Sequence, residues 1–487
     1  MKRKRMGSLV GATLALSLVL TGCQGVKSAK LDPKNPVTVT VWHYYAGGQQ
    51  EAFNKLVSEF NSSEGLERGI VVEAENHGTV EQLASDVKDS LAKKVGAAEV
   101  PGIICGYGDT IYDIDKGGNI VSLDEYLSED ELKEYIPSYI EEGRLGEGDK
   151  LKIFPTAKST EIFMMNKTDW DVFAEATGAS LDKLETIEGV VETAKGYYEW
   201  TDARTPDVPD DGKAFFGRDA VANYLIVGSR QLGIELCKVK DGKVTFNTDK
   251  EVLRKLWDCY YVPSINGYFG AYGKFRSDDA KVGDLLAFVG STTSASYFPK
   301  EVFNEENESH PIEAFVLPVP VFADGEKYAV QQGAGMAVIK SDAQKEYAAV
   351  EFLKWFTQAD RNLEFAVSSG YLPVKTEALD KNKLETAIAN SGEQIPENLK
   401  ETLEIAFDTC SSQKLYTNRP FEGASGVRSV LEYNMADKIN ADLEEINKLV
   451  AGGMSRAEAA AGYDTDENFE SWYSDFCQKL EDTQKEQ

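Results

Sequence analysis

Alternating strand and helix patterns near residue 37 constrain the fold of this chain most. Residues 37–41, with the sequence VTVTV, alternate apolar and polar side chains with period two, which predicts a strand. Apolar residues then return at helical spacing over residues 53–60. Another strand, helix and strand are expected over residues 69–75, 83–95 and 102–106. This order favours a mostly parallel sheet that is covered by helices on both faces.

Local signals predict further elements along the chain. Thr79 and Gln82 form a capping-box pattern at the start of one helix, and Ser341 with Gln344 repeats this pattern at the start of another. Residues 238–246 carry Asp-Gly between alternating apolar residues, which predicts a β-hairpin. From about residue 370 onward the pattern is helical.

The first 23 residues have the pattern of a secretion signal. Basic residues at 2–5 precede an apolar stretch over 9–20, which is too short to span a bilayer core of about 30 Å. The letters LTGC, which end at Cys23, resemble the lipobox of bacterial lipoproteins, in which a diacylglyceryl group joins the thiol. We therefore expect residues 1–22 to be a lipoprotein signal peptide and Cys23 to carry acyl chains such as palmitate. An ordinary secretory signal cut nearby is the alternative.

This signal predicts a protein outside the cytoplasm, anchored to the outer face of the cell membrane. Residues 23–36 are polar and aperiodic, so we expect a tether. The net charge of -29 argues against nucleic acid as a partner, because an acidic surface repels phosphates. The remaining length fits two lobes better than one core. Five cysteines follow Cys23 without a C-x-x-C pair, which favours buried thiols and leaves one disulfide open.

Five segments of the sequence carry a family resemblance. In order they are VTVWHYYAGGQQEAFNKLVSEFN, FPTAKSTEIFMMNKT, FVGSTTSASYF, FVLPVPVF and QQGAGMAVIKSDAQKEYAAVEFLKWFTQADRNLEFAVSSGYLP. They resemble the bacterial extracellular solute-binding proteins of family 1, which serve ABC importers of sugars and related polyols. The second resembles the first crossing between lobes, the third a ligand loop, and the last two the return into the first lobe. The resemblance covers residues 37–375 and is loose beyond them.

The resemblance implies an α/β fold of two lobes, the periplasmic-binding-protein-like class II arrangement, with a hinge and an interlobe cleft. The expected lobes are residues 37–154 with 312–372 and residues 158–308 with 376–480. The expected hinge crossings are residues 155–157, 309–311 and 373–375. Ligands of open α/β sheets bind beyond the carboxyl ends of strands and between domains, which independently favours a cleft site.

The resemblance also implies a function. It predicts a binding protein, not an enzyme, that captures a mono- or oligosaccharide by lobe closure and delivers it to the permease subunits of an ABC importer. We expect a monomer that meets the membrane through its lipid. A polyol phosphate such as glycerol 3-phosphate is the alternative ligand. An extracellular carbohydrate-active enzyme is the other alternative, although H-E-x-x-H, G-x-S-x-G and P-loop patterns are absent from the sequence.

Candidate ligand contacts follow from the chemistry of sugars, which present apolar C–H faces and many hydroxyl groups. Trp42, Tyr44 and Tyr45 follow the first strand and are expected in the cleft, with packing over the sheet edge as the alternative. Asp109 follows the third strand as a hydroxyl acceptor, or else as a turn or helix cap. Asp219 is a candidate in the second lobe, with a surface or core position as its alternative.

Two hydroxyl-rich segments supply further candidates. Ser159, Thr160 and Glu161 lie in the first crossing segment, where the resemblance implies exposure to ligand. Pairing of Glu161 with a lysine is the alternative for that residue. Ser291 and Thr292 follow a glycine, which permits close backbone approach, and their hydroxyls donate or accept. A helix N-cap explains these two residues equally well.

Glycine and arginine residues complete the candidate set. Gly333 and Gly335 are expected to keep the backbone open at the ligand wall, with a tight strand exit as the alternative. Arg419 favours a phosphorylated or carboxylated ligand if it faces the cleft, because guanidinium binds such groups bidentately. A surface position is its alternative. We expect no metal and no cofactor, since the acidic loop over 207–212 fails the EF-hand spacing.

Overall fold

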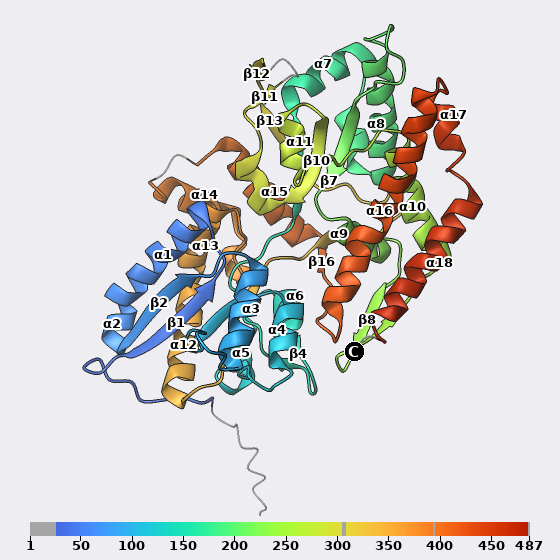
Figure 1. The fold of residues 1–487 in the computed structure, drawn as a ribbon. Coiled ribbons are helices and arrows are strands. Elements are labelled where there is room, and N and C mark those ends of the chain that lie inside the picture. Colours follow the sequence, from blue (N-terminus) through green and yellow to red (C-terminus); the bar gives the residue numbers. More distant parts are fainter. Residues whose placement is uncertain (1–25, 304–307, 393–394, 486–487) are drawn as a thin grey trace, which may run out of the picture.

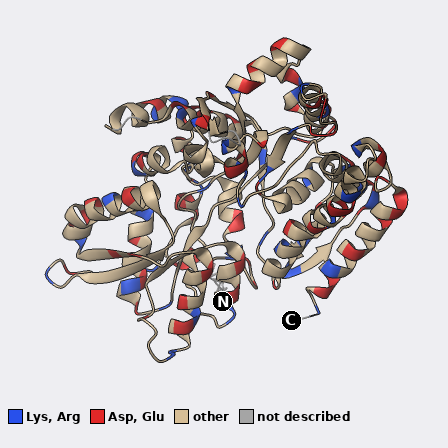
Figure 2. Ribbon diagram, turned by 45° about the horizontal axis from the view of Figure 1, so that its top comes forward, with Lys and Arg blue, Asp and Glu red and all other residues tan. Residues whose placement is uncertain are grey.

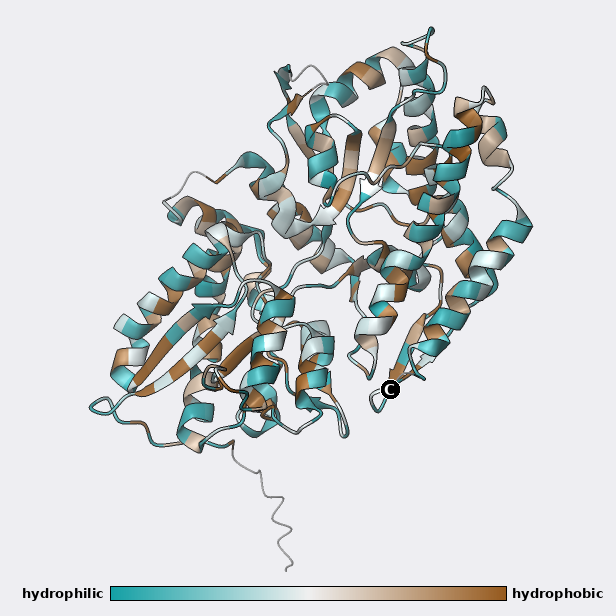
Figure 3. Ribbon diagram, in the orientation of Figure 1, coloured by the Kyte–Doolittle hydropathy of each residue, from teal (hydrophilic) through white to brown (hydrophobic). Residues whose placement is uncertain are grey.

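The protein has two lobes, each built on a four-stranded sheet (Figure 1). The computed structural model describes residues 26–303, 308–392 and 395–485. The expected signal peptide and Cys23 lie outside the described residues. Strands are mostly coloured as hydrophobic in both lobes, with hydrophilic residues toward the end of β2, while the outer helices alternate hydrophilic and hydrophobic residues (Figure 3). Both lobes therefore follow the usual arrangement of a buried sheet under amphipathic helices.

The first lobe contains the predicted parallel sheet. Its strand order is β15-β3-β1-β2, in which β1 runs parallel to β2 and β3, and β15 is antiparallel to β3. The strands are β1 (Val37–His43), β2 (Ile70–Asn76), β3 (Ile103–Gly106) and β15 (Gly335–Val338). The three strands predicted near the start of the chain are confirmed. Parallel strands need helical crossovers, and the chain supplies them.

Helices from two distant parts of the sequence cover the first sheet. They are α1 (Gly47–Ser62), α2 (Glu64–Arg68), α3 (Val80–Leu91), α4 (Gly108–Asp115), α12 (Ala343–Phe356) and α13 (Ala359–Ser369). The capping box of Thr79 and Gln82 is confirmed. At α12 the expected cap was wrong, because the Asp342 carboxylate, and not Ser341, accepts from the amides of Gln344 and Lys345.

The second lobe has a mixed sheet with the order β13-β6-β10-β7. Its strands are β6 (Glu161–Asn166), β7 (Ala214–Arg218), β10 (Leu285–Ser291) and β13 (Ala314–Leu317). Strand β6 is antiparallel to both β10 and β13, whereas β10 and β7 are parallel. Residues 314–317 therefore belong to this sheet. The expected return to the first lobe at residue 312 is too early, and the chain rejoins the first sheet at β15.

Two groups of helices sandwich the second sheet. One cluster joins the face bearing Phe163 and Met165 to helices α7–α10 and α16–α18, and another joins the face bearing Ile162 and Met164 to α13–α15. The helices are α7 (Lys167–Thr177), α8 (Ile187–Asp202), α9 (Val221–Gln231), α10 (Lys250–Ile265), α11 (Arg276–Lys281), α14 (Lys381–Asn390), α15 (Glu397–Ser412), α16 (Ala424–Ala451), α17 (Arg456–Ala461) and α18 (Asp466–Asp482). The C-terminal helices thus complete the second lobe (Figure 1).

Short elements connect these layers. The predicted hairpin is confirmed as β8 (Cys237–Lys240) and β9 (Lys243–Phe246). The other short strands are β4 (Arg144–Leu145), β5 (Lys150–Leu151), β11 (Glu301–Phe303), β12 (Ser309–Pro311), β14 (Tyr328–Val330) and β16 (Lys414–Tyr416). The short helices are α5 (Glu129–Leu132), α6 (Pro137–Glu142), η1 (Leu123–Glu125), η2 (Leu181–Glu185), η3 (Thr292–Tyr297) and η4 (Thr376–Ala378).

Three crossing segments lie side by side between the lobes. Lys158 forms a bridge with Leu372, and Ser159 forms one with Gln332, both antiparallel. The first and last expected crossings are therefore displaced by only a few residues. The middle one is wrong, because residues 309–311 form β12 and pair with β11 within the second lobe. Its place is taken by the segment around Gln332.

The described residues of the expected tether contact the first lobe. The backbone amide of Lys27 donates to the Glu125 carbonyl at 2.6 Å, and the Lys27 ammonium pairs with the Glu125 carboxylate. The amide of Gln344 donates to the carbonyl of Lys30 at 2.7 Å. Leu31 packs against the core of the first lobe. Residues 27–31 therefore bind along that lobe, which leaves a shorter stretch to act as a tether.

Thiols and charges are distributed as the composition predicts. Cys105, Cys237 and Cys259 are buried free thiols, and the described residues form no disulfide. No described helix is long and apolar enough to cross a bilayer. Acidic residues are spread along the outer helices of both lobes (Figure 2). A large net charge of -29 that is spread over both lobes favours solubility.

We expect His43 to make the protein less stable in mild acid. This ring is fully buried at the end of β1, and its Nδ1 accepts from the Tyr45 amide at 3.2 Å. Desolvation, and secondly the charge of His77, lower the pKa of His43 to about 4 from its ordinary 6.5. Between these values the unfolded chain binds a proton that the folded chain does not. The contribution of His43 to the free energy of unfolding is therefore fully present above pH 6.5. The free energy of unfolding falls by about 1–2 kcal/mol from pH 7 to pH 5.

Chemical denaturation at pH 7 and pH 5 checks this prediction. The His43→Gln variant should lose less unfolding free energy on acidification than the unaltered protein. His310, whose side chain is half exposed, supplies the matched control His310→Gln, which should keep the full loss. Equal losses in all three proteins would contradict the assignment.

Candidate functional site

The strand directions of the second sheet bring three polar residues to one edge. Because β6 is antiparallel to β10, its first residue Glu161 lies opposite the last residue of β10, Ser291. Because β7 is parallel to β10, its last residue Arg218 lies at the same edge, opposite Val289. This edge meets the crossing segments, so the polar groups converge where both lobes join.

A buried ion pair is the centre of this edge. Arg218 Nη2 lies 2.6 Å from Glu161 Oε2, and the two side chains are 7% and 4% exposed. Asn223 of α9 donates to the other oxygen of Glu161 at 2.8 Å and to the Gln332 side chain at 3.1 Å. Burial raises the pKa of Glu161, and Arg218 opposes this effect. The network thus links α9, strands β6 and β7, and a crossing segment.

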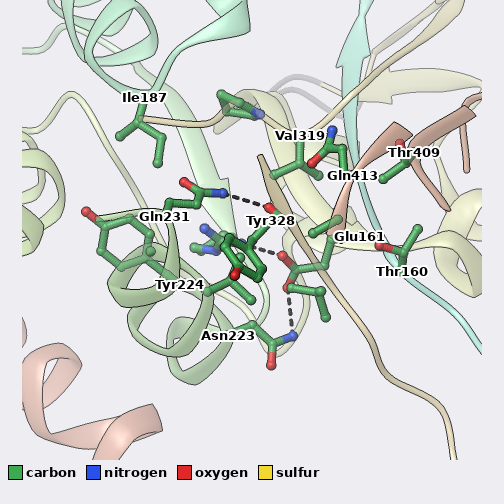
Figure 4. A pocket seen from close by; sticks show the side chains of 16 residues that line it. Thr160, Glu161, Ile187, Asn223, Tyr224, Gln231, Val319, Tyr328, Thr409 and Gln413 are labelled. Atoms are coloured by element: carbon green, nitrogen blue, oxygen red, sulfur yellow. Dashed lines mark hydrogen bonds and ion pairs between the residues drawn. The ribbon is translucent and has the colours of Figure 1, made fainter. Parts of the chain in front are cut away.

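A small cavity lies beside this network, and we call it the base cavity. It has a volume of about 30 Å³, which accommodates about two water molecules and is far below the size of a ligand pocket. Figure 4 shows Thr160, Glu161, Asn223 and Gln231 around it. Thr160 Oγ1 and Arg218 Nε are buried without a hydrogen-bond partner. These atoms are free to bind water or a ligand hydroxyl.

Aromatic residues of the first lobe gather at the ends of β1 and β3. Tyr44 stacks on Tyr107 with ring centroids 6.3 Å apart and an angle of 16°. The Tyr44 hydroxyl is buried without a partner, and the Tyr107 side chain is 41% exposed. The third crossing segment adds Tyr371, which stacks on Phe365. This lobe therefore offers an aromatic surface with one unpaired hydroxyl.

The lobes also contact each other beside the crossings, where α4 and the β4–β5 turn meet residues 419–425. Asp109 accepts from the Ser425 hydroxyl at 3.1 Å. Arg419 pairs with Asp149 at 2.7 Å, and Lys116 pairs with Glu422 at 3.2 Å. Asp109 and Arg419, both expected to meet a ligand, are therefore engaged between the lobes, Asp109 by a neutral hydroxyl and Arg419 by a carboxylate that neutralises it.

Several other predicted residues lie at the expected edge. Thr292 donates its amide to the Thr160 carbonyl at 2.9 Å, and its hydroxyl is buried without a partner. Ser291 caps η3 by accepting from the Thr293 amide, as its alternative predicted. Asp219 accepts the Arg276 amide at 2.8 Å, and burial raises its pKa. Glu161 pairs with arginine and not with lysine.

Two predicted aromatic contacts are instead core residues. Trp42 is 1% exposed, donates to Glu75 at 2.8 Å and stacks on His77. Tyr45 is 2% exposed and packs among Phe53 and other rings of the first lobe. Helices cover both faces of β1, so burial continues to its carboxyl end. The cleft expectation is wrong for these two residues.

The two predicted glycines serve packing at the crossings. Gly335 lies within β15, where a β-carbon would overlap Ile153 and the Phe154 carbonyl. Gly333 has φ +98°, and a β-carbon there would lie 3.0–3.2 Å from the backbone of residues 157–159. The tight-exit alternative accounts for both. Gly333 allows the first and second crossing segments to approach each other.

We expect Gly333→Ala to destabilise the protein by about 2–4 kcal/mol, because it adds both a strained φ and a backbone clash. Gly118→Ala is the matched control, since Gly118 has φ +68° and open space around its Cα. Its loss should be about 1 kcal/mol, due to strain alone. Denaturant unfolding measures both, and equal losses would refute the close approach.

Sequence reasoning missed important members of this region. Asn223 sits in the mostly apolar first half of α9, and Gln332 precedes the predicted Gly333. Arg428 of α16 donates to Asn223 at 3.3 Å and has no carboxylate within salt-bridge distance among the described residues. It is exposed and lies three residues beyond Ser425, which meets Asp109 of the first lobe. Only the tertiary structure brings it here.

The comparisons with known proteins agree with this architecture. A family model described as bacterial extracellular solute-binding protein matches residues 55–391, well over half of the chain. The comparison with curated proteins found no match.

Solved structures of related architecture were found. UgpB from Mycobacterium tuberculosis, in complex with glycerophosphocholine, has a TM-score of 0.62 at 16% identity, over 91% of this chain and 99% of that one. The cyclic alpha-maltosyl-1,6-maltose binding protein from Arthrobacter globiformis has a TM-score of 0.60 at 19% identity, and the match covers 91% of this chain and 100% of that one. The lacto-N-biose complex of a binding protein from Bifidobacterium longum has a TM-score of 0.60 at 16% identity, and the match covers 93% of this chain and 98% of that one. These likenesses confirm the two-lobe fold, and with the family match they show that the chain belongs to the bacterial extracellular solute-binding proteins.

Proposed function

We propose that this protein captures a carbohydrate, a mono- or oligosaccharide, between its lobes and delivers it to the permease of an ABC importer. The observation that carries the proposal is the set of unpartnered polar atoms around the base cavity, Thr160 Oγ1 and Arg218 Nε, at the junction of the lobes. A sugar hydroxyl placed there would satisfy them, and its ring would rest against the aromatic surface of Tyr44 and Tyr107.

Lobe closure supplies the signal for delivery. A ligand that touches both lobes binds the closed form better than the open form, and this difference in affinity shifts the population. The crossing segments near Ser159, Gln332 and Leu372 are then the hinge, because they are the paired strands that join the lobes. The lobe boundaries follow from this hinge. The molecule acts as a monomer outside the cytoplasm, held to the membrane through Cys23.

A polyol phosphate is the second candidate ligand. Arg419, the residue that favoured this ligand in the sequence, is paired with Asp149. Arg428 replaces it, because this exposed guanidinium beside Asn223 has no carboxylate partner among the described residues. Guanidinium binds phosphate bidentately. The solved complex of UgpB with glycerophosphocholine supports the same candidate, since its fold is similar.

A thermal-shift panel of sugars, polyols and their phosphates tests the proposal. A ligand in excess of its dissociation constant raises the unfolding temperature, and a carbohydrate binder should respond to at least one neutral sugar. Response to phosphate esters alone, abolished by Arg428→Ala, would establish the second candidate. Catalytic turnover of an oligosaccharide would reject the binding role and support an enzyme.

A further inference from the structure

Two exposed aromatic rings stand in one short loop of the second lobe, residues 271–275. The side chain of Tyr272 is 62% exposed and that of Phe275 is 51% exposed. Single exposed apolar residues are ordinary, but two within four positions form a local apolar surface. This loop joins α10 to α11 and lies outside the ion-pair network described above.

A buried ion pair fixes the backbone of this loop. Asp279 accepts the amides of Tyr272 at 3.1 Å and Gly273 at 2.6 Å, and Arg276 donates to the Gly273 carbonyl at 2.6 Å. Arg276 and Asp279 are 2.8 Å apart and almost completely buried. Burial of two charges has a large desolvation cost, which their hydrogen bonds to the loop offset. The loop is therefore ordered before any ligand arrives.

The Tyr272 ring lies against the backbone at Gly270. A β-carbon on Gly270 would lie 2.6–2.8 Å from the atoms Cε2, Cζ and Oη of this ring. The glycine thus allows this close approach, and most of the Tyr272 side chain remains exposed to solvent. The ammonium of Lys274 lies 5.2 Å from the Phe275 ring centroid. Both aromatic side chains are therefore accessible from solvent, and aromatic rings are the groups on which sugars stack.

The loop also faces the site between the lobes. The amide of Arg276, next to Phe275, donates to Asp219, which directly follows β7. Asp219 comes one residue after Arg218 of the base cavity. From the first lobe, Glu81 at the start of α3 is within electrostatic reach of Lys274; the Thr79 hydroxyl chiefly, and Lys274 in addition, lower the Glu81 pKa. The loop therefore lies between the sheet edge and the other lobe.

We propose that residues 271–275 form a second carbohydrate subsite, in which Tyr272 and Phe275 stack on a sugar ring, so that the natural ligand is an oligosaccharide. This inference rests on the proposed function and narrows it. The base cavity of about 30 Å³ accepts no more than a substituent of one ring. The rest of the ligand must lie along the facing surfaces, where these rings are held. Arg276 and Asp279 are positioning residues, and they act through the loop backbone.

Calorimetric titration with sugar series tests the subsite. The probes are α-1,4-gluco-, β-1,4-gluco-, β-1,4-manno- and β-1,4-galacto-oligosaccharides of one to four units. One series should bind at least tenfold more tightly as its chain grows. Tyr272→Ala and Phe275→Ala should each reduce this gain about tenfold and leave the affinity for the monosaccharide unchanged. Tyr272→Phe should keep the gain, because it keeps the ring.

Two further variants make the test specific. Gly270→Ala should reduce the gain without removing any ring, because its methyl group displaces Tyr272. Tyr433→Ala, which removes an equally exposed ring on α16, should change nothing. Monosaccharide binding as tight as that of the oligomers, or an unchanged gain in the Tyr272→Ala/Phe275→Ala variant, would overturn the subsite and leave the proposed function intact. Failure of every sugar to bind would instead reject the proposed function.

Discussion

Replacement of Arg218 by methionine should destabilise the protein by about 3–5 kcal/mol at pH 8 and abolish ligand binding. The substitution leaves the Glu161 carboxylate buried without its cation, which is the most costly way to break an ion pair. Burial already raises the pKa of Glu161 with Arg218 present, so loss of the cation raises it further. The folded variant then binds a proton more readily than the unfolded chain. The free energy of unfolding that the Arg218→Met variant loses should therefore become smaller as the pH falls from 8 toward 5.

Two companion variants separate charge from packing. Glu161→Gln combined with Arg218→Met removes both charges and keeps an acceptor for Asn223, so it should recover most of the stability and none of the binding. Lys133→Met breaks a highly exposed pair with Asp130 and should leave the stability almost unchanged, because solvent screens that pair. Denaturant unfolding and calorimetric titration measure these outcomes. Arg218→Met with unaltered stability and affinity would show that this edge is not the site.

Substitution of Cys23 by serine should remove lipid from the protein completely. The thiol is the attachment point in the proposed anchor, and a serine hydroxyl does not replace it. Labelling of cells with an alkyne-bearing palmitate analogue, followed by isolation of the protein, should give a labelled native chain and an unlabelled Cys23→Ser variant. Stable anchoring requires at least two acyl chains, so the labelled protein should sediment with the membrane fraction and should be released from it by detergent.

Cys477→Ser is the control for this labelling, because it alters a half-buried thiol of α18 and leaves the LTGC segment intact. It should be labelled like the native chain. Equal labelling of the Cys23→Ser variant would place the lipid elsewhere, and an unlabelled native chain would favour an ordinary secretory signal.

Local periodicity was sufficient to predict the first lobe's framework. The alternation at Val37–His43 and the helical spacing of α1 depend only on neighbours in sequence, so β1 to β3 were found. The cap of α12 was missed by one residue because Ser341 and Asp342 are both good acceptors. Strand β13 was assigned to the wrong lobe, because an apolar strand does not reveal which sheet it joins.

The site was harder to predict than the fold. Trp42 and Tyr45 follow a strand that is covered on both faces, so their position in sequence does not distinguish the core from the edge. Arg419 is neutralised by Asp149, a partner about 270 positions away. Tyr272 and Phe275 were not among the predicted residues, and only the tertiary structure shows that their side chains are exposed. Glu161 was predicted because the crossing segment resembles its family.

A crystal structure of the protein with the tightest ligand from the sugar panel tests the central claim most directly. We predict one carbohydrate molecule between the lobes, with a hydroxyl in the base cavity beside Thr160 and Arg218 and with contacts to Tyr107 from the other lobe. A ligand bound to the outer surface of one lobe, with the base cavity unchanged, would contradict capture between the lobes.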